Sequence, residues 1–219
     1  MASRARVEEY RRLNQDLVTL AERDLAAFWK QLDKSNVAAA REALITYMNA
    51  LTITYGRPSA LIAARFYDDL RAASPNAAGR FTALLAPGPD TEQVAGSVRW
   101  AIGAITGDSP DEAAALERLS GAAQRFITDQ GRNTIALSSS RDPSAGGWAR
   151  VPSGRHTCDF CTMLASRGPV YRSASTAGDG AHYHDRCSCV PTQIWDGDDL
   201  PNGYDPDALY EDYVARQSA

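Results

Sequence analysis

The chain has 219 residues, which is enough to bury a sizeable hydrophobic core without covalent staples. Its 23 Lys and Arg stand against 27 Asp and Glu, and the net charge of -4 disfavours a general binder of polyanions, whose domains are usually basic. The N-terminus lacks the apolar region of a secretory signal, and no run approaches the roughly 18 uncharged apolar residues that span a bilayer, so we expect a soluble protein without membrane contacts.

The first part of the sequence predicts amphipathic helices. Apolar residues recur about every 3.6 positions over residues 5–32, which predicts one long helix. A second helix is predicted over residues 37–55, where Gly56 and Pro58 should stop it, and Pro58 should open a third that runs to about Ala73. The positions expected to face inward are Val7, Tyr10, Leu13, Leu17, Leu20, Leu25, Phe28, Leu32, Leu44, Tyr47, Met48, Leu51, Leu61, Phe66, Tyr67 and Leu70.

Further helices are predicted after these. A short helix is expected over residues 81–85, and the turn at residues 87–90 should lead into a helix over residues 91–105. Residues 109–112 form an S-x-x-E capping box with proline at the first helical position, which predicts the start of a long helix. Its inward positions should be Leu116, Leu119, Phe126, Ile127 and Ile135.

The character of the sequence changes at residues 138–147, a polar stretch rich in Ser and Gly that predicts a linker. No long helical period follows, and the pattern predicts one helical turn over residues 160–167 that ends at Gly168. Short strands are predicted at residues 148–151, 170–171 and 188–195. We therefore expect an α+β fold in which a mainly helical domain, residues 1–139, precedes a small zinc-stabilised α+β module, residues 140–195.

Residues 196–219 form an acidic C-terminal tail. They hold seven acidic groups and one base, Arg216, so the tail carries a net charge of -6 and residues 1–195 carry +2. We expect a solvated end with a short helix, and the alternative is a segment that docks on a basic partner surface.

All four cysteines and all three histidines lie between positions 156 and 189. In a chain without an export signal, such close spacing favours metal binding over a disulfide framework. Cys158 and Cys161 form a C-x-x-C pair, whose tight turn can aim two thiolates at one point, and zinc takes four tetrahedral nitrogen or sulfur ligands. The other ligands must come from a second segment, which offers His184, Cys187 and Cys189.

Five donors therefore compete for four zinc positions. If Ser188 lies in a strand, Cys187 and Cys189 point to the same face, and both can reach the metal in an all-cysteine site with His184 beside it. A site of three cysteines and one histidine, in which His184 joins one of that pair, is equally reasonable. Because all four positions are then filled, no place remains for a catalytic water, and we expect one structural Zn²⁺ ion per chain.

Other interpretations of the cysteines are reduced thiols, a redox pair or disulfides. A redox C-x-x-C follows a parallel strand in a βαβ setting, and no such pattern is visible here. A deaminase would need H-x-E with P-C-x-x-C, and the sequences around His156 and His182 lack the glutamate. We expect these two histidines on the surface or beside the ligands.

The same residues carry a family likeness. The run RVPSGRHTCDFCTMLASRGPVY over residues 150–171 and the run YHDRCSCVP over residues 183–191 resemble the C-terminal motif of tailed-phage MuF-like head-morphogenesis proteins. The likeness is strongest to minor capsid proteins of actinobacterial phages, whose pattern is C-x-x-C, a loop and then H-x-x-C-x-C. Asp185 and Ser188 depart from the residues common in that loop, but the candidate ligands are intact. The N-terminal part agrees only in being helical.

The resemblance implies a minor capsid protein with a structural role in assembly and in DNA packaging or delivery. Its implied location is the virion, at the portal vertex or in the capsid interior, with a stay in the host cytoplasm during assembly. The implied partners are the portal protein, the major capsid protein and packaged DNA, with multiple copies per virion. Phe28 and Trp29 either extend an apolar face to such a partner or belong to the core.

Two alternatives accompany this interpretation. Residues 141–172 hold five arginines and two aspartates, with Trp148 and Tyr171 nearby for base stacking, a pattern that fits a zinc-containing nucleic-acid-binding protein. A nuclease or maturation protease is the weaker alternative, because no recognisable motif places a nucleophile beside a base and His182 is the one serious candidate. We therefore expect no enzymatic activity and assign no catalytic residue.

Overall fold

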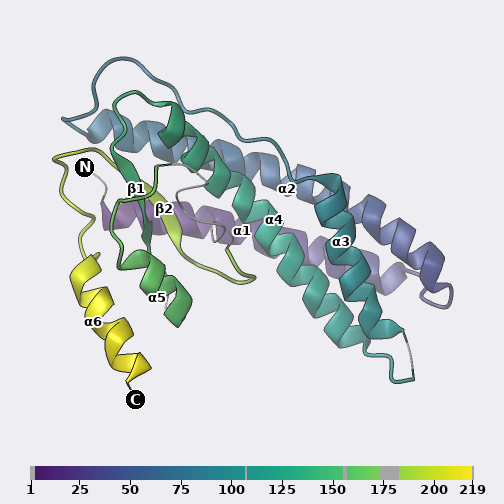
Figure 1. The fold of residues 1–219 in the computed structure, drawn as a ribbon. Helices are drawn as coiled ribbons and strands as arrows, with labels where there is room; N and C mark the ends of the chain where they lie inside the picture. Colours follow the sequence, from purple (N-terminus) through teal and green to yellow (C-terminus); the bar gives the residue numbers. More distant parts are fainter. Residues whose placement is uncertain (1–2, 107, 155–156, 173–182, 219) are drawn as a thin grey trace.

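Three long helices dominate the computed structural model, which describes residues 3–106, 108–154, 157–172 and 183–218. In chain order the elements are α1 (Arg4–Gln31), α2 (Val37–Ala73), α3 (Thr91–Ile102), the 3-10 helix η1 (Gly103–Ile105), α4 (Glu112–Arg141), β1 (Gly147–Val151), α5 (Asp159–Ala165), β2 (Val190–Ile194) and α6 (Pro206–Gln217). The helices α1, α2 and α4 lie lengthwise against one another (Figure 1). α3 covers one end of them, and the two strands with α5 and α6 lie at the other. This arrangement confirms the α+β class with a mainly helical body.

Two hydrophobic cores lie along the long helices. The distal core, beside α3, consists of Val18, Ala21, Leu25, Trp29, Leu44, Met48, Leu51, Val94, Val98, Ala101, Ile102, Ile105, Ala115, Leu119, Ala122, Ala123, Phe126 and Ile127. The module core, beside the strands, consists of Val7, Tyr10, Ala63, Phe66, Tyr67, Leu70, Ile135, Ala149, Val151, Ala165, Val190, Ile194, Trp195 and Tyr204. Because the module core draws on α1, α2, α4 and both strands, the strands pack directly against the helical body.

A polar layer separates the two cores. The Ser59 hydroxyl donates to Asn14 Oδ1 at 2.5 Å, and Asn14 Nδ2 donates to the carbonyl of Tyr10 at 3.0 Å. α2 and α4 cross closely here, since a Cβ placed on Gly131 would lie 2.6 Å from Ser59 Oγ. Glycine at this position is what lets the two helices approach.

The predicted stop of the second helix was wrong, because α2 continues through Gly56 and Pro58. Gly56 serves packing instead, since a Cβ there would lie 2.3 Å from Gln130 Oε1 on α4. Proline inside a helix costs about 3 kcal/mol, and the long contact of α2 with α4 on both sides of Pro58 outweighs that cost. The unbroken helix also turns Leu61 outward, where it is 52% exposed, and buries Ala60 and Ala63 instead.

The first helix is confirmed as α1, with two differences on its predicted inner face. Leu20 is 41% exposed, and the polar Asn14 is buried in the polar layer. Trp29 belongs to the distal core, and the Phe28 ring stacks on Tyr47 with ring centroids 3.9 Å apart. Trp29 is therefore a core residue and Phe28 packs against the core, as one of the two interpretations had it.

The short helix predicted over residues 81–85 does not form, and residues 81–90 are extended. Their backbone N–H groups find partners on the flanking helices α2 and α4. The three bonds run from Ala83 N to Asp68 Oδ1 at 2.9 Å, from Leu84 N to Ser138 Oγ at 3.0 Å, and from Ala86 N to Thr134 Oγ1 at 3.0 Å. Side chains of other elements thus supply the partners that a helix would have supplied internally.

The helix predicted over residues 91–105 is confirmed as α3 followed by η1. The next helix, α4, is also confirmed, but its cap is Asp111 and not Ser109, because Asp111 Oδ1 accepts the N–H of Ala114 at 2.8 Å. At its other end α4 continues to Arg141. The linker prediction was therefore wrong for residues 138–141, where Ser138 is buried and hydrogen-bonded to the extended segment.

The strands predicted at residues 148–151 and 188–195 form as β1 and β2, which pair antiparallel with Trp148 opposite Gln193. The third predicted strand is a single bridge between Trp148 and Tyr171. The predicted helical turn is α5, and the tail contains the predicted short helix, α6, none of whose residues is buried. The tail is not solvated throughout, however, because Tyr204 is buried in the module core. No helix among the described residues is both long enough and apolar enough to cross a bilayer.

Candidate metal centre

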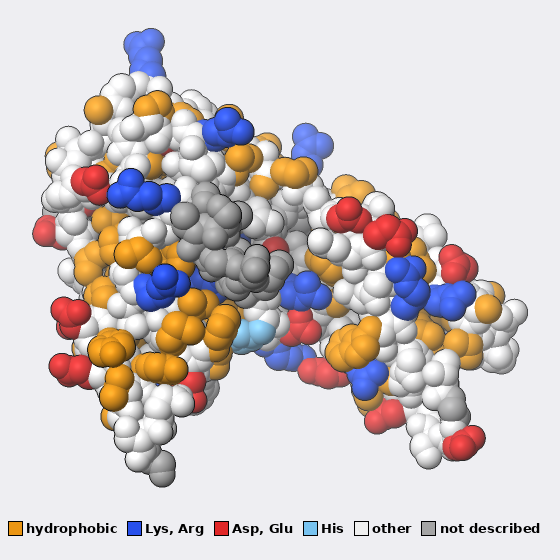
Figure 2. Space-filling model, viewed as in Figure 1, with side chains coloured by type: hydrophobic (Ala, Val, Ile, Leu, Met, Phe, Trp, Pro, Cys, Tyr) orange, Lys and Arg blue, Asp and Glu red, His pale blue; other side chains and the backbone are white. Residues whose placement is uncertain are grey.

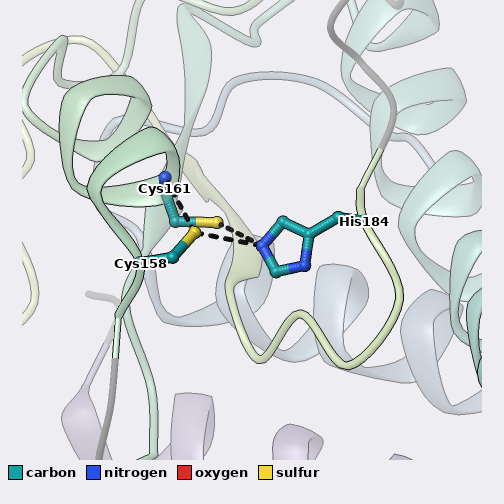
Figure 3. A group of neighbouring side chains, drawn as sticks. All are labelled: Cys158, Cys161 and His184. Atoms are coloured by element: carbon teal, nitrogen blue, oxygen red, sulfur yellow. Dashed lines mark hydrogen bonds between the residues drawn. The ribbon is translucent and has the colours of Figure 1, made fainter.

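Cys158, Cys161 and His184 converge at the N-terminus of α5 (Figure 3). Cys158 is the N-cap residue of α5, and Cys161 lies in its first turn. From the facing loop, His184 Nε2 lies 3.1 Å from Cys158 Sγ and 3.4 Å from Cys161 Sγ. Residues 183–189, which we call the ligand loop, thus bring a nitrogen donor to the C-x-x-C pair.

The remaining cysteines of the ligand loop complete the group. Cys187 Sγ lies 3.5 Å from Cys161 Sγ, and the sulfurs of Cys161, Cys187 and Cys189 all lie within 4.8 Å of one another. All five predicted donors line one hollow of the surface. With zinc–sulfur bonds of about 2.3 Å, the sulfurs of a tetrahedral site stand about 3.8 Å apart, so each of the two groups of three donors, which share Cys161, has a spacing that can hold a metal ion.

Local backbone structure explains how each half of the group is formed. The C-x-x-C spacing matches the first turn of α5, where the Cys158 sulfur accepts the N–H of Cys161 at 3.4 Å. In the ligand loop, Arg186 has a φ of 64°, in the left-handed region that few residues other than glycine adopt. The resulting turn lets Cys187 N donate to the carbonyl of His184 at 3.2 Å and brings both side chains to the same hollow.

His184 is oriented for binding through Nε2. Its Nδ1 lies 2.7 Å from the carbonyl oxygen of Asp185, and because a carbonyl only accepts, Nδ1 must carry the proton. The Nε2 lone pair of the neutral ring then faces the two sulfurs. A histidine fixed by a hydrogen bond from its second nitrogen is the usual arrangement of a metal ligand.

The thiols differ in acidity. Hydrogen bonds shared with Cys187 and Cys189 raise the pKa of Cys161, and the bond from Cys161 lowers the pKa of Cys187. Burial opposes ionisation of Cys158, but hydrogen bonds from Cys161 outweigh it and lower the pKa of Cys158. The group therefore favours thiolates at Cys158 and Cys187, and the thiolate is the form that binds metals.

The ligand loop is anchored on α4 by ion pairs and close packing. Arg125 Nε pairs with Asp185 Oδ1 at 2.9 Å, and Arg186 Nη2 pairs with Glu117 Oε1 at 2.5 Å. Gly121 makes room for the loop, since a Cβ there would lie 2.7 Å from Asp185 Oδ2. Sequence reasoning missed these α4 residues, although a glycine inside a helix was a signal of close packing.

A second anchor lies beneath the loop. Arg132 of α4 donates from Nη2 to the carbonyl oxygen of Cys187 at 2.7 Å. The Tyr183 ring lies between two buried guanidinium groups, with its centroid 3.8 Å from Arg132 Cζ and 4.1 Å from Arg150 Cζ. The donors are thus supported by residues of α4 and β1 as well as by their own loops.

The donors differ in their exposure to solvent. Cys158 and His184 are exposed, whereas Cys161, Cys187 and Cys189 are buried. Figure 2 shows apolar side chains gathered over the end of the molecule where α5 and α6 lie. The predicted surface or neighbouring positions of His156 and His182 lie outside the described residues.

Other predicted roles fare differently. Trp148 and Tyr171, suggested for base stacking, are buried and stack on each other with ring centroids 4.7 Å apart. Arg150, counted among the basic residues, is also buried. The C-x-x-C pair does stand at a helix N-terminus, but β1 pairs antiparallel with β2, so the described residues lack the parallel strands of a βαβ redox protein.

These features define an α+β protein with a cysteine and histidine group that can hold a metal ion. The family model described as "VG15 protein" matches residues 1–216, and the chain belongs to the VG15 family. It is similar to the "Gene 15 protein" of Mycobacterium phage D29, with 45% identity over 74 residues, which are 32% of this chain and 26% of the relative. It is also similar to the "Gene 15 protein" of Mycobacterium phage L5, with 39% identity over 82 residues, 32% of this chain and 27% of the relative.

The matched region spans about a quarter of the length of these two curated relatives. No solved structure matches the chain. The family and both relatives confirm the expectation of a phage protein.

Proposed function

We propose that this phage protein is a minor capsid protein of the MuF-like type with a structural role in head morphogenesis. The observation that carries the proposal is the meeting of the C-x-x-C and H-x-x-C-x-C donors in one hollow, at the junction of the helical body and the strands. This is the motif that resembles the MuF-like proteins, and membership of a phage family over residues 1–216 supports it.

The role of the centre in this proposal is to hold one Zn²⁺ ion per chain. Cys158, Cys161, His184 and Cys187 are the proposed ligands, because each has a sulfur or nitrogen contact of 3.5 Å or less with another of the four. Cys189 is the fifth donor; it is buried, and its sulfur lies within 4.8 Å of those of Cys161 and Cys187. Sulfur and imidazole donors favour zinc over magnesium or calcium.

Four protein ligands fill the tetrahedral positions and leave none for a catalytic water. The ion therefore supplies folding energy, and no enzymatic activity is proposed. The helical body, residues 1–139, would contact the portal or major capsid protein. In the virion the protein would occupy the portal vertex or the inner capsid in multiple copies, where packaged DNA is a further neighbour.

The metal is tested by elemental analysis of protein purified without added metal, with about one zinc per chain expected. Cobalt substitution then tests the ligands, because the sulfur-to-cobalt charge-transfer band grows with the number of bound thiolates. Cys187→Ser should weaken this band, and Cys189→Ser should leave it unchanged. If only Cys189→Ser weakens the band, the fourth ligand is Cys189 and not Cys187. A natively folded protein without metal would refute the site.

The assembly role is tested in the phage itself. Mass spectrometry of purified virions should find the protein, and cross-linking should join it to the portal or major capsid protein. Cys161→Ser should abolish its incorporation, whereas Ser140→Ala, a change at an exposed residue of α4, should not. A protein that is abundant in infected cells but absent from virions would refute the proposed function.

A further inference from the structure

We propose that Arg132 of α4 is the positioning residue of the metal centre, which holds the ligand loop so that His184 and Cys187 face the ion. The proposal rests on the metal centre proposed above. It assigns a role to a residue far from the cysteines in sequence, and it makes metal affinity depend on a helix of the body.

The Arg132 guanidinium contacts both ends of the ligand-bearing segment. Its Nη2 donates to the carbonyl oxygen of Cys187 at 2.7 Å, and its Cζ lies 3.8 Å from the centroid of the Tyr183 ring. Tyr183 directly precedes His184, so one group contacts the side chain before the first proposed ligand and the backbone carbonyl of the second. A shift of the guanidinium would move both donors together.

Arg132 is itself fixed in place. It is 5% exposed, and its Nη1 pairs with Asp129 Oδ1 at 2.8 Å, one turn earlier on α4. A buried guanidinium is costly unless it is paired and hydrogen-bonded, and Arg132 has both kinds of partner. A planar fork of donors can serve a carboxylate and a carbonyl at once, which the single ammonium of lysine does less well.

The charge of Arg132 also suits its neighbours. A zinc ion with three thiolates and one neutral histidine carries a net charge of -1, and a buried cation beside it stabilises that charge. Geometry and charge therefore point to the same role.

Arg125 offers a matched control. It also holds the ligand loop, through an ion pair with Asp185 at 2.9 Å, but this pair is partly exposed at 31% and 40%. It contacts a side chain between the ligands rather than the backbone of a ligand. Loss of Arg125 therefore removes a loop contact of similar length, while the buried contacts of Arg132 remain.

The experiment compares Arg132→Met, Arg132→Lys and Arg125→Met. Zinc affinity is measured by competition with a chromophoric chelator, and the stability of each metal-free form by urea unfolding. Loss of a group that orients metal ligands costs about 10–100-fold in affinity, so Arg132→Met should bind zinc at least about tenfold more weakly than wild type. The zinc affinity of Arg132→Lys should lie between those of Arg132→Met and wild type. Arg125→Met should lose less than about fivefold in zinc affinity, as expected for a partly exposed ion pair.

Cobalt spectra separate positioning from general stability. In Arg132→Met the d–d bands of bound cobalt should shift, whereas in Arg125→Met they should match wild type. Equal zinc affinities and identical cobalt spectra in the two methionine variants would overturn the proposal, even if Arg132→Met lowers stability. If Arg132→Met does not fold, Arg132→Lys decides, and wild-type affinity and spectrum in that variant would overturn it. Wild-type protein that takes up no zinc would refute the metal centre itself. Normal zinc binding by wild type with equal behaviour of the two methionine variants would refute only the role of Arg132.

Discussion

At the distal end of the long helices, apolar side chains such as Leu25, Leu44 and Leu119 meet in one fully buried core. At the other end, the same helices meet a two-stranded sheet and the cysteine group through buried charges and hydrogen bonds, among them Arg132 and Asp142. The difference shows that one set of helices can be held mainly by hydrophobic burial at one end and by a second hydrophobic core together with specific polar contacts at the other.

The sizes of the elements explain why the two ends differ. α3 brings twelve residues to the distal end, with several of them buried in the core. β1 and β2 have five residues each and α5 has seven. A two-stranded sheet and a two-turn helix are marginal by themselves, so this end needs either a metal or anchoring contacts to stay ordered.

Metal removal should have the largest effect, and it should destabilise only the end of the molecule that holds the strands and the cysteine group. A structural zinc site binds with about 10–16 kcal/mol, and that free energy is coupled to folding. Chelation should therefore speed amide hydrogen exchange in β1, α5 and β2, while amides of α3 and the adjoining halves of α1 and α2 keep their protection. Exchange detected by mass spectrometry, with and without chelator, measures this.

Cys161→Ser gives the matching genetic test, because Cys161 belongs to both triads of close donors. Its exchange pattern without chelator should equal that of the chelated wild type. Uniform loss of protection along the whole chain would show that the two ends unfold as one unit, and the comparison would fail.

Leu119→Ala should produce the opposite pattern. Leu119 is fully buried in the distal core, and truncation of such a leucine costs about 2–5 kcal/mol. Urea unfolding should show this loss, while zinc affinity stays at the wild-type value. Ile53→Ala, at a position 62% exposed on α2, should change stability by less than about 0.5 kcal/mol. A parallel fall in zinc affinity in Leu119→Ala would contradict independent ends.

Periodicity predicted α1, α3 and α4 because their apolar stripes are local properties of the sequence. The unbroken α2 was not predictable in the same way, since the role of Gly56 depends on Gln130 of α4. The extended conformation of residues 81–90 was unpredictable for the same reason, because its hydrogen-bond partners lie on α2 and α4. These errors concern residues whose conformation is decided by another element.

The candidate site likewise has a part that local sequence patterns predict and a part that depends on another element. The five cysteine and histidine residues that line the hollow could be named from the sequence, because C-x-x-C and H-x-x-C-x-C are local patterns with a chemical meaning. Arg132 lies 55 positions from Cys187, the residue whose carbonyl it binds, and no spacing rule marks it. The proposed choice of Cys187 over Cys189 likewise rests on sulfur positions, since alternate residues of an extended chain point the same way.

Asp142→Asn should weaken the strand end in a pH-dependent manner. Asp142 is the C-cap of α4, and its carboxylate accepts bonds from Arg71 Nε at 2.8 Å and from the Ser144 backbone N–H at 3.0 Å. Hydrogen bonds to a charged group contribute about 1.5–3 kcal/mol, and the variant should lose about that much at neutral pH.

The sign of the pH dependence follows from the pKa of Asp142. Burial alone would raise that pKa, but the bonds from Arg71 and Ser144 outweigh it and hold the pKa below its usual value. The carboxylate therefore stabilises the fold above the unfolded pKa of about 3.9, and this contribution is lost as pH falls through the lower folded value. Urea midpoints of wild type and Asp142→Asn should differ at pH 7 and converge under acid. A constant difference would contradict the ionic role, and Asp69→Asn at an exposed pair should match wild type throughout.

Gly131→Ala tests the polar layer between the two ends, with the smallest expected effect. A Cβ there would lie 2.6 Å from Ser59 Oγ and 3.0 Å from the Ser59 carbonyl oxygen, and backbone cannot move aside cheaply. Overpacking of this kind costs about 1–3 kcal/mol. Gly96→Ala in α3 has no atom within 4 Å of its new Cβ and should stabilise the protein by about 0.5–1 kcal/mol, as alanine does inside a helix.

The position of Gly131 makes its variant informative beyond stability. Because α2 and α4 pass through both cores, separating them at the polar layer should speed hydrogen exchange on both sides, unlike metal removal or Leu119→Ala. Faster exchange confined to the distal core would mean that the strands and the ligand loop hold α4 in place without help from this crossing. Exchange confined to the strand end would instead make Gly131 part of the support of Arg132, its neighbour on α4, and zinc affinity would then fall in Gly131→Ala but not in Gly96→Ala.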